Sequence, residues 1–245
     1  MKEKKFREPL LKKMERKVGR YAIRNLMLII ILITALVWLL DMIVYERSGT
    51  SILYWLMFDR EAIFRGEVWR IISFIFIPQY DGLLYLAIGL YIDWLIGDAL
   101  ETEWGSFRFN VFYFSGILGA ILSGFITGYA TNYYLNLSLF LAFAILNPEF
   151  KLYIFFFIPL KVKWIAILDA VGLTLLFLVG TTMTRIALIM SLINLVLFFG
   201  KDIYWKIKNF FRRRRYVREV LEAERERFEN NEYNGNNKSD DPFEL

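Results

Sequence analysis

Histidine and cysteine are both absent from this 245-residue chain. The two absences exclude a Ser-His or Cys-His nucleophile, histidine general acid–base catalysis, thiolate chemistry and disulfide bonds. They also exclude haem held by histidine or cysteine, iron–sulfur clusters held by cysteine, and ordinary zinc sites. Carboxylates, lysine, arginine, hydroxyl groups and the backbone remain for chemistry. The sequence therefore predicts neither a bound metal nor a cofactor.

Charged residues are scarce between residue 25 and Gly200, although 22% of the whole chain is charged. Hydrophobic residues make up 57% of the chain and aromatic residues 18%. An ordinary soluble domain is only about 45–50% apolar, even with glycine counted. This composition excludes a soluble enzyme, a disordered chain and a fibrous repeat. It predicts an all-α membrane protein with several spans.

Six apolar segments are predicted to cross the membrane, because a spanning helix needs roughly 17–25 mostly apolar residues. They are Asn25–Val44, Leu83–Ala99, Phe109–Gly128, Tyr133–Leu146, Val162–Val179 and Arg185–Gly200. The fourth and the sixth are short, which predicts local membrane thinning or burial behind neighbouring helices. The apolar runs Val68–Ile77 and Leu152–Leu160 are too short to cross. They are predicted to lie in the interface or to be re-entrant.

Lysine and arginine gather at both ends of the chain, before residue 25 and after Gly200. The positive-inside rule places both ends in the cytoplasm, which requires an even number of spans. We predict a basic N-terminal segment (1–24), a six-helix membrane domain (25–200), a charged cytoplasmic helix (201–228) and a disordered tail (229–245). The small size and the lack of an organelle address favour a bacterial cytoplasmic membrane, with the endoplasmic reticulum as the alternative.

A cluster of four arginines, Arg212–Arg215, follows the last span. A polybasic segment close to a membrane attracts anionic lipid headgroups. The same charge also suits nucleic acid, but its position next to a span favours lipid. We therefore predict that the partners of this segment are anionic lipids and not nucleic acid.

The first loop, Tyr45–Gly82, is long and rich in aromatic side chains. Such side chains suit the headgroup region, so we expect a structured loop that lies partly in the outer leaflet. Trp69, in the second half of the loop, is predicted to be an interfacial ring. The next residue, Arg70, can satisfy backbone carbonyls of a folded loop. After the second span, Glu101 is placed to cap a helix or to pair with Arg108.

These residues carry a resemblance to a known family. The segment Arg65–Ile77, with Trp69 and Arg70 at its centre, is similar to the Trp-Arg motif in the first loop of the rhomboid superfamily. The spacing of Gly97, Glu101 and Gly105 resembles the pattern at the end of the second rhomboid helix. The resemblance covers about residues 65–200. It implies a six-transmembrane-helix rhomboid-like bundle with a long structured first loop.

The catalytic pattern of that family is not present. Active rhomboid proteases use a serine on the fourth helix, a histidine on the sixth, and a His–Asn pair on the second. Here Ser138 lies between leucines, the oxyanion positions fall near Tyr85 and Gly89, and no histidine exists. A serine without an activating base is a poor nucleophile. The chain is therefore more similar to inactive members such as derlins, which bind membrane clients and thin the bilayer locally. This implies a protein that is not an enzyme.

Small residues recur every four positions along the third span, at Gly116, Ala120, Gly124 and Gly128. Such a stripe lets helix backbones approach closely in a membrane. We interpret it as a helix-packing face and expect this helix to be central.

Two aspartates, Asp93 and Asp169, lie near the middle of the second and fifth predicted spans. Charges inside a membrane are expensive and often mark a function. If the two helices face each other, they form a lateral gate with a polar groove for a client's transmembrane segment. Alternatively, each aspartate only fixes packing. The candidate client-binding residues are Tyr85, Gly89, Asp93, Asn136, Asp169 and Asn194.

Two other functions stay open at this point. Asp93 and Asp169 can relay protons in a proton-coupled transporter, although the sequence shows no evident repeat and no helices broken by glycine or proline. An intramembrane protease with a non-standard active site is the second alternative.

Overall fold

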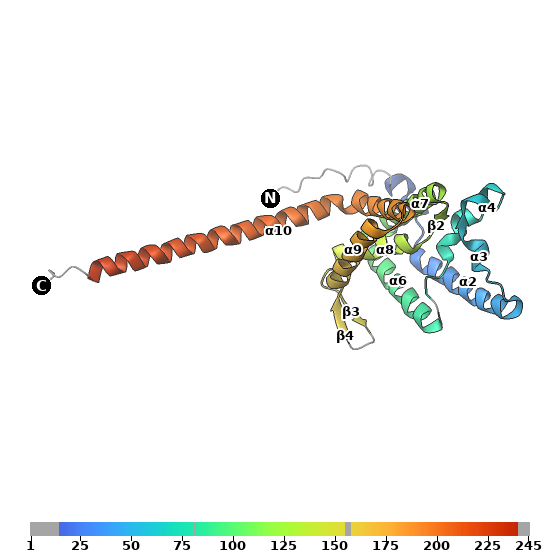
Figure 1. Cartoon of the computed structure of the whole chain (residues 1–245), viewed down its shortest axis with the longest axis horizontal. Helices are drawn as coiled ribbons and strands as arrows, with labels where there is room; N and C mark the ends of the chain where they lie inside the picture. Colours follow the sequence, from blue (N-terminus) through green and yellow to red (C-terminus); the bar gives the residue numbers. More distant parts are fainter. Residues whose placement is uncertain (1–14, 81, 155–157, 240–245) are drawn as a thin grey trace. The chain divides into compact units, whose positions relative to one another are not determined.

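The computed structural model describes residues 15–80, 82–154 and 158–239, and most of these residues are helical (Figure 1). Within these residues, five helical segments are long and apolar enough to cross a membrane. They are α2 (Leu26–Ser48, within the apolar segment Glu15–Ser48), α6 (Leu83–Trp104), α7 (Ser106–Thr127), α9 (Val162–Val179) and the first part of α10, Thr182–Gly200. Helices satisfy every backbone polar group internally, which lipid requires. The prediction of a helical multi-pass membrane protein is confirmed.

The predicted fourth span is a helix, but a short one. It is α8 (Tyr133–Leu146), with 14 residues. At about 1.5 Å per residue, such a helix is about 21 Å long, whereas the hydrocarbon core is about 30 Å thick. α8 therefore falls below the usual length of a spanning helix, and the crossing of the membrane by all six predicted spans stays a prediction.

The first loop is folded, as predicted. It contains α3 (Leu53–Leu56), β1 (Phe58–Asp59), α4 (Arg60–Phe64), α5 (Arg70–Ser73) and the 3₁₀ turn η2 (Phe74–Phe76). The strand β1 pairs antiparallel with β2 (Tyr129–Ala130), which follows α7. The Phe58 ring is almost fully buried and packs edge-on against Phe74 and Phe125. The aromatic residues therefore form a small core that fixes the loop to the end of α7.

A β-hairpin forms in one of the two short apolar runs. Strands β3 (Lys151–Ile154) and β4 (Ile158–Lys161) pair antiparallel between α8 and α9. As predicted, the run Leu152–Leu160 does not form a helix that crosses the membrane. The prediction did not include its strand form. Aromatic and β-branched residues favour strands, which accounts for the difference.

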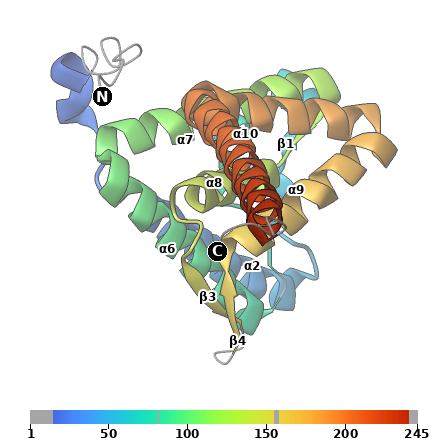
Figure 2. The same cartoon turned by 90° about the vertical axis from the view of Figure 1, so that its left-hand side faces the viewer.

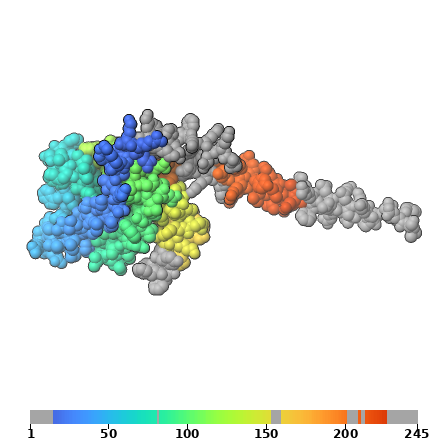
Figure 3. Space-filling model, turned by 180° about the vertical axis from the view of Figure 1, so that it is seen from behind, coloured from blue at the N-terminus to red at the C-terminus, as the bar shows by residue number. Residues whose placement is uncertain are grey.

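The helices pack against one another through α6, α7 and α8. α6 packs against α2, α7 and α8, and α9 packs against α8 and β4. Figure 2 shows α8 between α6 and α9, which hardly contact each other. Figure 3 shows the molecule from behind relative to Figure 1, and there α2 (blue) lies beside the first loop (cyan) and α6 (green). α7 packs against α6, α8 and β2 and is the most buried of the five candidate spans, which agrees with the central position that the stripe of small residues predicts.

The chain divides into two compact units, residues 1–198 and 199–245. The boundary falls two residues before the predicted end of the membrane domain at Gly200. Helix α10 (Thr182–Ser239) continues through the predicted cytoplasmic helix and through most of the predicted disordered tail 229–245. That tail prediction is corrected for residues 229–239, where no proline interrupts the helix. Residues 1–14 and 240–245 lie outside the described residues.

Candidate functional site

The Trp-Arg motif holds the first loop together. Arg70 is buried, with 4% of its surface exposed. Its Nη1 donates to the carbonyls of Tyr54 and Met57 at 2.8 and 3.0 Å, and its Nε donates to Glu67 at 2.6 Å. Trp69 remains half exposed and donates from Nε1 to the carbonyl of Trp55 at 3.0 Å. The prediction that Arg70 satisfies loop carbonyls is confirmed.

The second motif, formed by Gly97, Glu101 and Gly105, lies where α6 ends and α7 begins. A Cβ at Gly97 would overlap the side chain of Met27, so this glycine lets α2 approach α6. Glu101 accepts hydrogen bonds from the backbone N–H of Asn25 at 2.9 Å and from Ser106 Oγ at 2.6 Å. Gly105 has a φ of 80°, which favours glycine, and lies between the two helices.

The predicted pair of Glu101 with Arg108 is not found among the described residues. Instead, the Glu101 carboxylate caps the start of α2 and holds the α6–α7 corner. The residues of the motif therefore have structural roles, and none of them lies in a cavity described below.

The four small residues of α7 have different roles. A Cβ at Gly116 would overlap Leu135 and touch Asn194, and a Cβ at Gly124 would overlap Phe58 and Ala130. Gly128 has a φ of 99° and ends α7. Ala120 lines a cavity between α7, α8 and α10. These contacts agree with the packing interpretation of the stripe.

Asn194, a predicted client-binding residue, packs between two helices in this structure. It is 3% exposed on α10 and faces α7. Its Oδ1 accepts from Ser115 Oγ at 2.7 Å, and its Nδ2 donates to the carbonyl of Phe112 at 3.1 Å. Donor and acceptor of the amide are therefore both engaged in a buried helix contact.

The end of the first loop enters the helix bundle. Asn132, just before α8, donates from Nδ2 to the carbonyls of Ile75 and Ile77 at 2.9 and 3.0 Å. The side-chain amide of Gln79 donates to Asn132 Oδ1. This anchor places Tyr80 against α6, where a Cβ on Gly89 would overlap the tyrosine ring. The missing side chain of Gly89 therefore makes the space that Tyr80 fills.

A polar cavity of about 20 Å³ lies next to this contact. Its polar lining comes from α2, the first loop, α6, α7 and the start of α8: Thr34, Gln79, Tyr80, Asp93, Tyr113, Asn132 and Asn136. Two predicted client-binding residues, Asp93 and Asn136, therefore share one cavity. Burial, with a smaller contribution from the Asp93 carboxylate, raises the pKa of Tyr80 to about 12. The Tyr80 phenol thus keeps its proton and can act as a hydrogen-bond donor.

Asp169 does not belong to this cavity. It lies on α9, which packs against α8 and β4, and it is absent from the residues that line the cavity around Asp93. The expected pair of Asp93 and Asp169 is therefore not formed in this structure. Tyr85, one turn before Gly89, is 68% exposed. Of the six predicted residues, Asp93 and Asn136 line the cavity, whereas Tyr85, Gly89 and Asp169 do not, and Asn194 lies in another helix contact.

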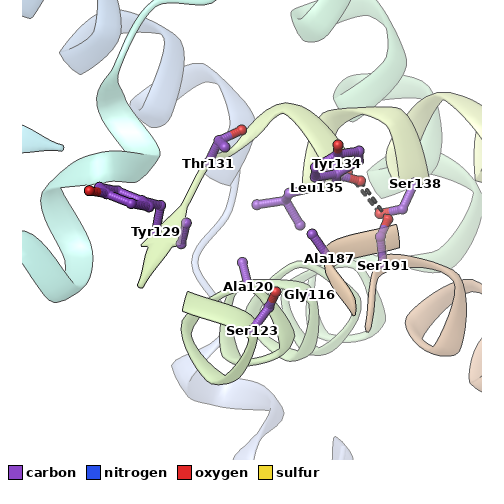
Figure 4. Close-up of a pocket in the computed structure, with 11 residues that line it drawn as sticks. Gly116, Ala120, Ser123, Tyr129, Thr131, Tyr134, Leu135, Ser138, Ala187 and Ser191 are labelled. Atoms are coloured by element: carbon purple, nitrogen blue, oxygen red, sulfur yellow. Dashed lines mark hydrogen bonds between the residues drawn. The ribbon is translucent and has the colours of Figure 1, made fainter. Parts of the chain in front are cut away.

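A second cavity of about 40 Å³, lined largely by hydroxyl groups and small residues, lies between α7, α8 and α10 (Figure 4). Ser138 Oγ donates to the carbonyl of Leu135 at 2.7 Å, and Ser191 Oγ donates to the carbonyl of Tyr134 at 2.6 Å. Ser123 Oγ is buried and has no hydrogen-bond partner among the described residues. The residues that line this cavity include no carboxylate and no amine. The cavity therefore offers neutral hydrogen bonds.

Sequence reasoning missed Thr34, Tyr80, Tyr113 and Asn132 as members of the polar cavity. In the sequence, each of them is an ordinary residue of an apolar span or of a loop end. One signal was available, since Gly89 precedes Asp93 by one helical turn and so leaves space next to the carboxylate. The partner that fills the space comes from a separate segment, and no local pattern identifies it.

No protein-family model, no curated protein and no solved structure matches this chain. The comparisons therefore add nothing to the motifs on which the rhomboid resemblance depends.

Proposed function

We propose that this chain is a non-proteolytic, rhomboid-like membrane protein that binds a transmembrane segment of another membrane protein. The segment binds beside α8, between α6 and α9. Both termini lie in the cytoplasm, and the protein resides in a bacterial cytoplasmic membrane. The basic residues at both ends of the chain support this orientation.

The loose attachment of α9 is the observation that carries the proposal. Val162, at its first turn, is the only residue of α9 that is buried. At its far end, Arg185 donates to the carbonyls of Phe177 and Leu178 at 2.8 Å each. Between these two attachments the helix exposes a row of large apolar side chains, including Ile167, Leu168, Val171 and Leu175. A helix held in this way can move away from α8 and make room there for a further helix.

The short length of α8 supports local bilayer thinning as part of the same function. A helix of about 21 Å that crosses a core of about 30 Å draws the two leaflets together. A client segment that enters beside α8 then meets a thinner apolar layer, in which its polar residues are less costly.

The state of Ser138 supports a non-proteolytic function. Its hydroxyl donates to a backbone carbonyl of its own helix. A serine nucleophile needs a base that accepts its proton, and the residues around this cavity are hydroxyl-bearing or apolar. A relay that uses Asp93 and Asp169 together finds no support, because the two residues do not share a cavity.

Site-specific photocrosslinking tests the proposal. A photoreactive residue at Leu168 on α9 or at Tyr85 on α6 should form protein adducts with a co-reconstituted single-span peptide. Leu32 is a matched control, since it is 61% exposed on α2, which does not flank α8. It should form lipid adducts only. If Leu168 and Tyr85 also capture only lipid, the chain does not bind clients at this place.

A further inference from the structure

We propose that the cavity around Asp93 recognises a basic side chain, lysine or arginine, carried within the client's transmembrane segment. This inference rests on the proposed function and names the class of client that the site selects. It concerns the chemistry of one carboxylate and of the groups that surround it.

The first observation is that Asp93 has no cationic partner. The residues that line its cavity include no lysine and no arginine, and Asp93 forms no ion pair and no hydrogen bond within the described part of the chain. Asp41, on α2, offers a contrast. Its carboxylate accepts from Ser51 Oγ and from the backbone N–H of Ile52, both at 2.7 Å. Carboxylates inside a membrane usually pair with a cation or line a pathway. A cation from another molecule completes the Asp93 site.

The second observation is that further oxygen atoms accompany the carboxylate. The side chains of Thr34 and Asn136 line the same cavity from α2 and α8. A lysine ammonium carries three donors and an arginine guanidinium carries five, and neither of them accepts hydrogen bonds. A carboxylate with hydroxyl and amide oxygens nearby matches that demand. An acidic client side chain would instead meet like charge.

The third observation concerns the space for such a group. The cavity of about 20 Å³ is too small for a lysine stem while Tyr80 lies over Gly89. Tyr80 belongs to the loop and not to a helix of the bundle, and its segment is held through the amide of Asn132. The client's basic side chain takes the place of the Tyr80 ring. Tyr85, Gly89 and Asp93 follow each other at one-turn spacing on α6 and lead from the exposed surface to the carboxylate.

The test uses the full-length protein in vesicles with three single-span peptides. The peptides are identical and rich in leucine, except for lysine, leucine or glutamate at one central position. A photoreactive residue at Tyr85 reports binding through the yield of peptide adduct. We expect the lysine peptide to give about tenfold more adduct than the leucine peptide, and the glutamate peptide to give the least. These comparisons need no change at Asp93 and so do not depend on the folding of a variant there.

A second comparison assigns the preference to Asp93. Asp93→Asn keeps the size and removes the charge, so the adduct yield with the lysine peptide should fall to about the yield with the leucine peptide. Asp98→Asn, on an exposed position of the same helix, should keep the preference. If the unmodified protein captures all three peptides equally, the selection of basic residues is wrong and the proposed function stands. If it captures none of them, the proposed function itself is wrong. An unchanged preference in a folded Asp93→Asn variant also overturns the inference.

Discussion

The ring of Tyr80 lies over Gly89, in a space that any side chain at residue 89 would fill. The contact joins the end of the first loop to the middle of α6. It also forms one wall of the polar cavity that contains Asp93. The loop and the bundle are therefore coupled at one position, and this position is accessible to experiment.

Substituting alanine for Gly89 should push Tyr80 out of its place. Overpacking of this kind costs about 1–3 kcal/mol, which for a chain of this size lowers Tm by roughly 2–4 °C per kcal/mol. Tryptophan fluorescence during heating in detergent measures the change. Gly172→Ala on α9 is the matched control, because a Cβ there meets no atom within 4 Å. Equal Tm values for the two variants would show that the Tyr80 contact is not tight.

Arg70→Gln should loosen the whole first loop. The substitution removes the charge and leaves the part-buried carbonyls of Tyr54 and Met57 without their donor, at up to about 1–3 kcal/mol for unsatisfied groups. Limited proteolysis of the loop in proteoliposomes should accelerate. Arg65→Gln changes an exposed arginine of the same loop and should leave the rate unaltered. A loop that is equally resistant in both variants would contradict the role of Arg70.

The number of crossings can be measured directly, because the chain has no cysteine of its own. Single cysteines at Lys17, Thr131 and Glu222 occupy exposed positions. With six crossings, an impermeant maleimide labels Thr131→Cys in intact cells and labels the other two only after permeabilisation. Labelling of Lys17→Cys and Glu222→Cys from opposite sides would mean that α8 does not cross.

The anchor of the β3–β4 hairpin should depend on pH. Hydrogen bonds from Lys161 and Lys163 lower the pKa of Glu149 to about 2, from an ordinary value of 4.5. A depressed carboxyl pKa contributes stability that is present above pH 4.5 and is lost as the pH falls towards 2. The contribution is modest, since the group is exposed.

A spin label on Leu160→Cys reports this loss as increased mobility below about pH 3. Glu149→Gln should be mobile at every pH. If its label is as rigid as that of the unmodified hairpin at pH 7, the Glu149 pairs do not hold the hairpin.

We propose that Arg212–Arg215 binds anionic headgroups, because all four side chains are exposed on α10. A spin label on Val217→Cys should lose contact with a water-soluble relaxing agent when the vesicles contain phosphatidylserine. High salt should reverse the effect, as screening requires. Replacing the four arginines by glutamine should abolish it. A label that responds equally in neutral vesicles would contradict the lipid interaction.

The motifs were easier to predict than the cavity, for a physical reason. Arg70 is a strong donor in an apolar loop, so the carbonyls of that loop are its natural partners. Asp93 was identified as unusual, but its surroundings were not. The helices here are apolar on all faces, so their sequences carry little information on which face is buried. The expected neighbour Asp169 lies on a helix that packs elsewhere, and the actual neighbour Tyr80 comes from a loop.

The sequence by itself determined that the chain is helical and lies in a membrane, because long apolar runs must satisfy their backbone groups within each helix. It also determined the absence of histidine and thiol chemistry. Only the tertiary structure decided which helices meet, that Tyr80 fills the space at Gly89, and that Asp93 lies among neutral polar groups. These features depend on packing between segments far apart in the chain, and such packing leaves no local periodicity in the sequence.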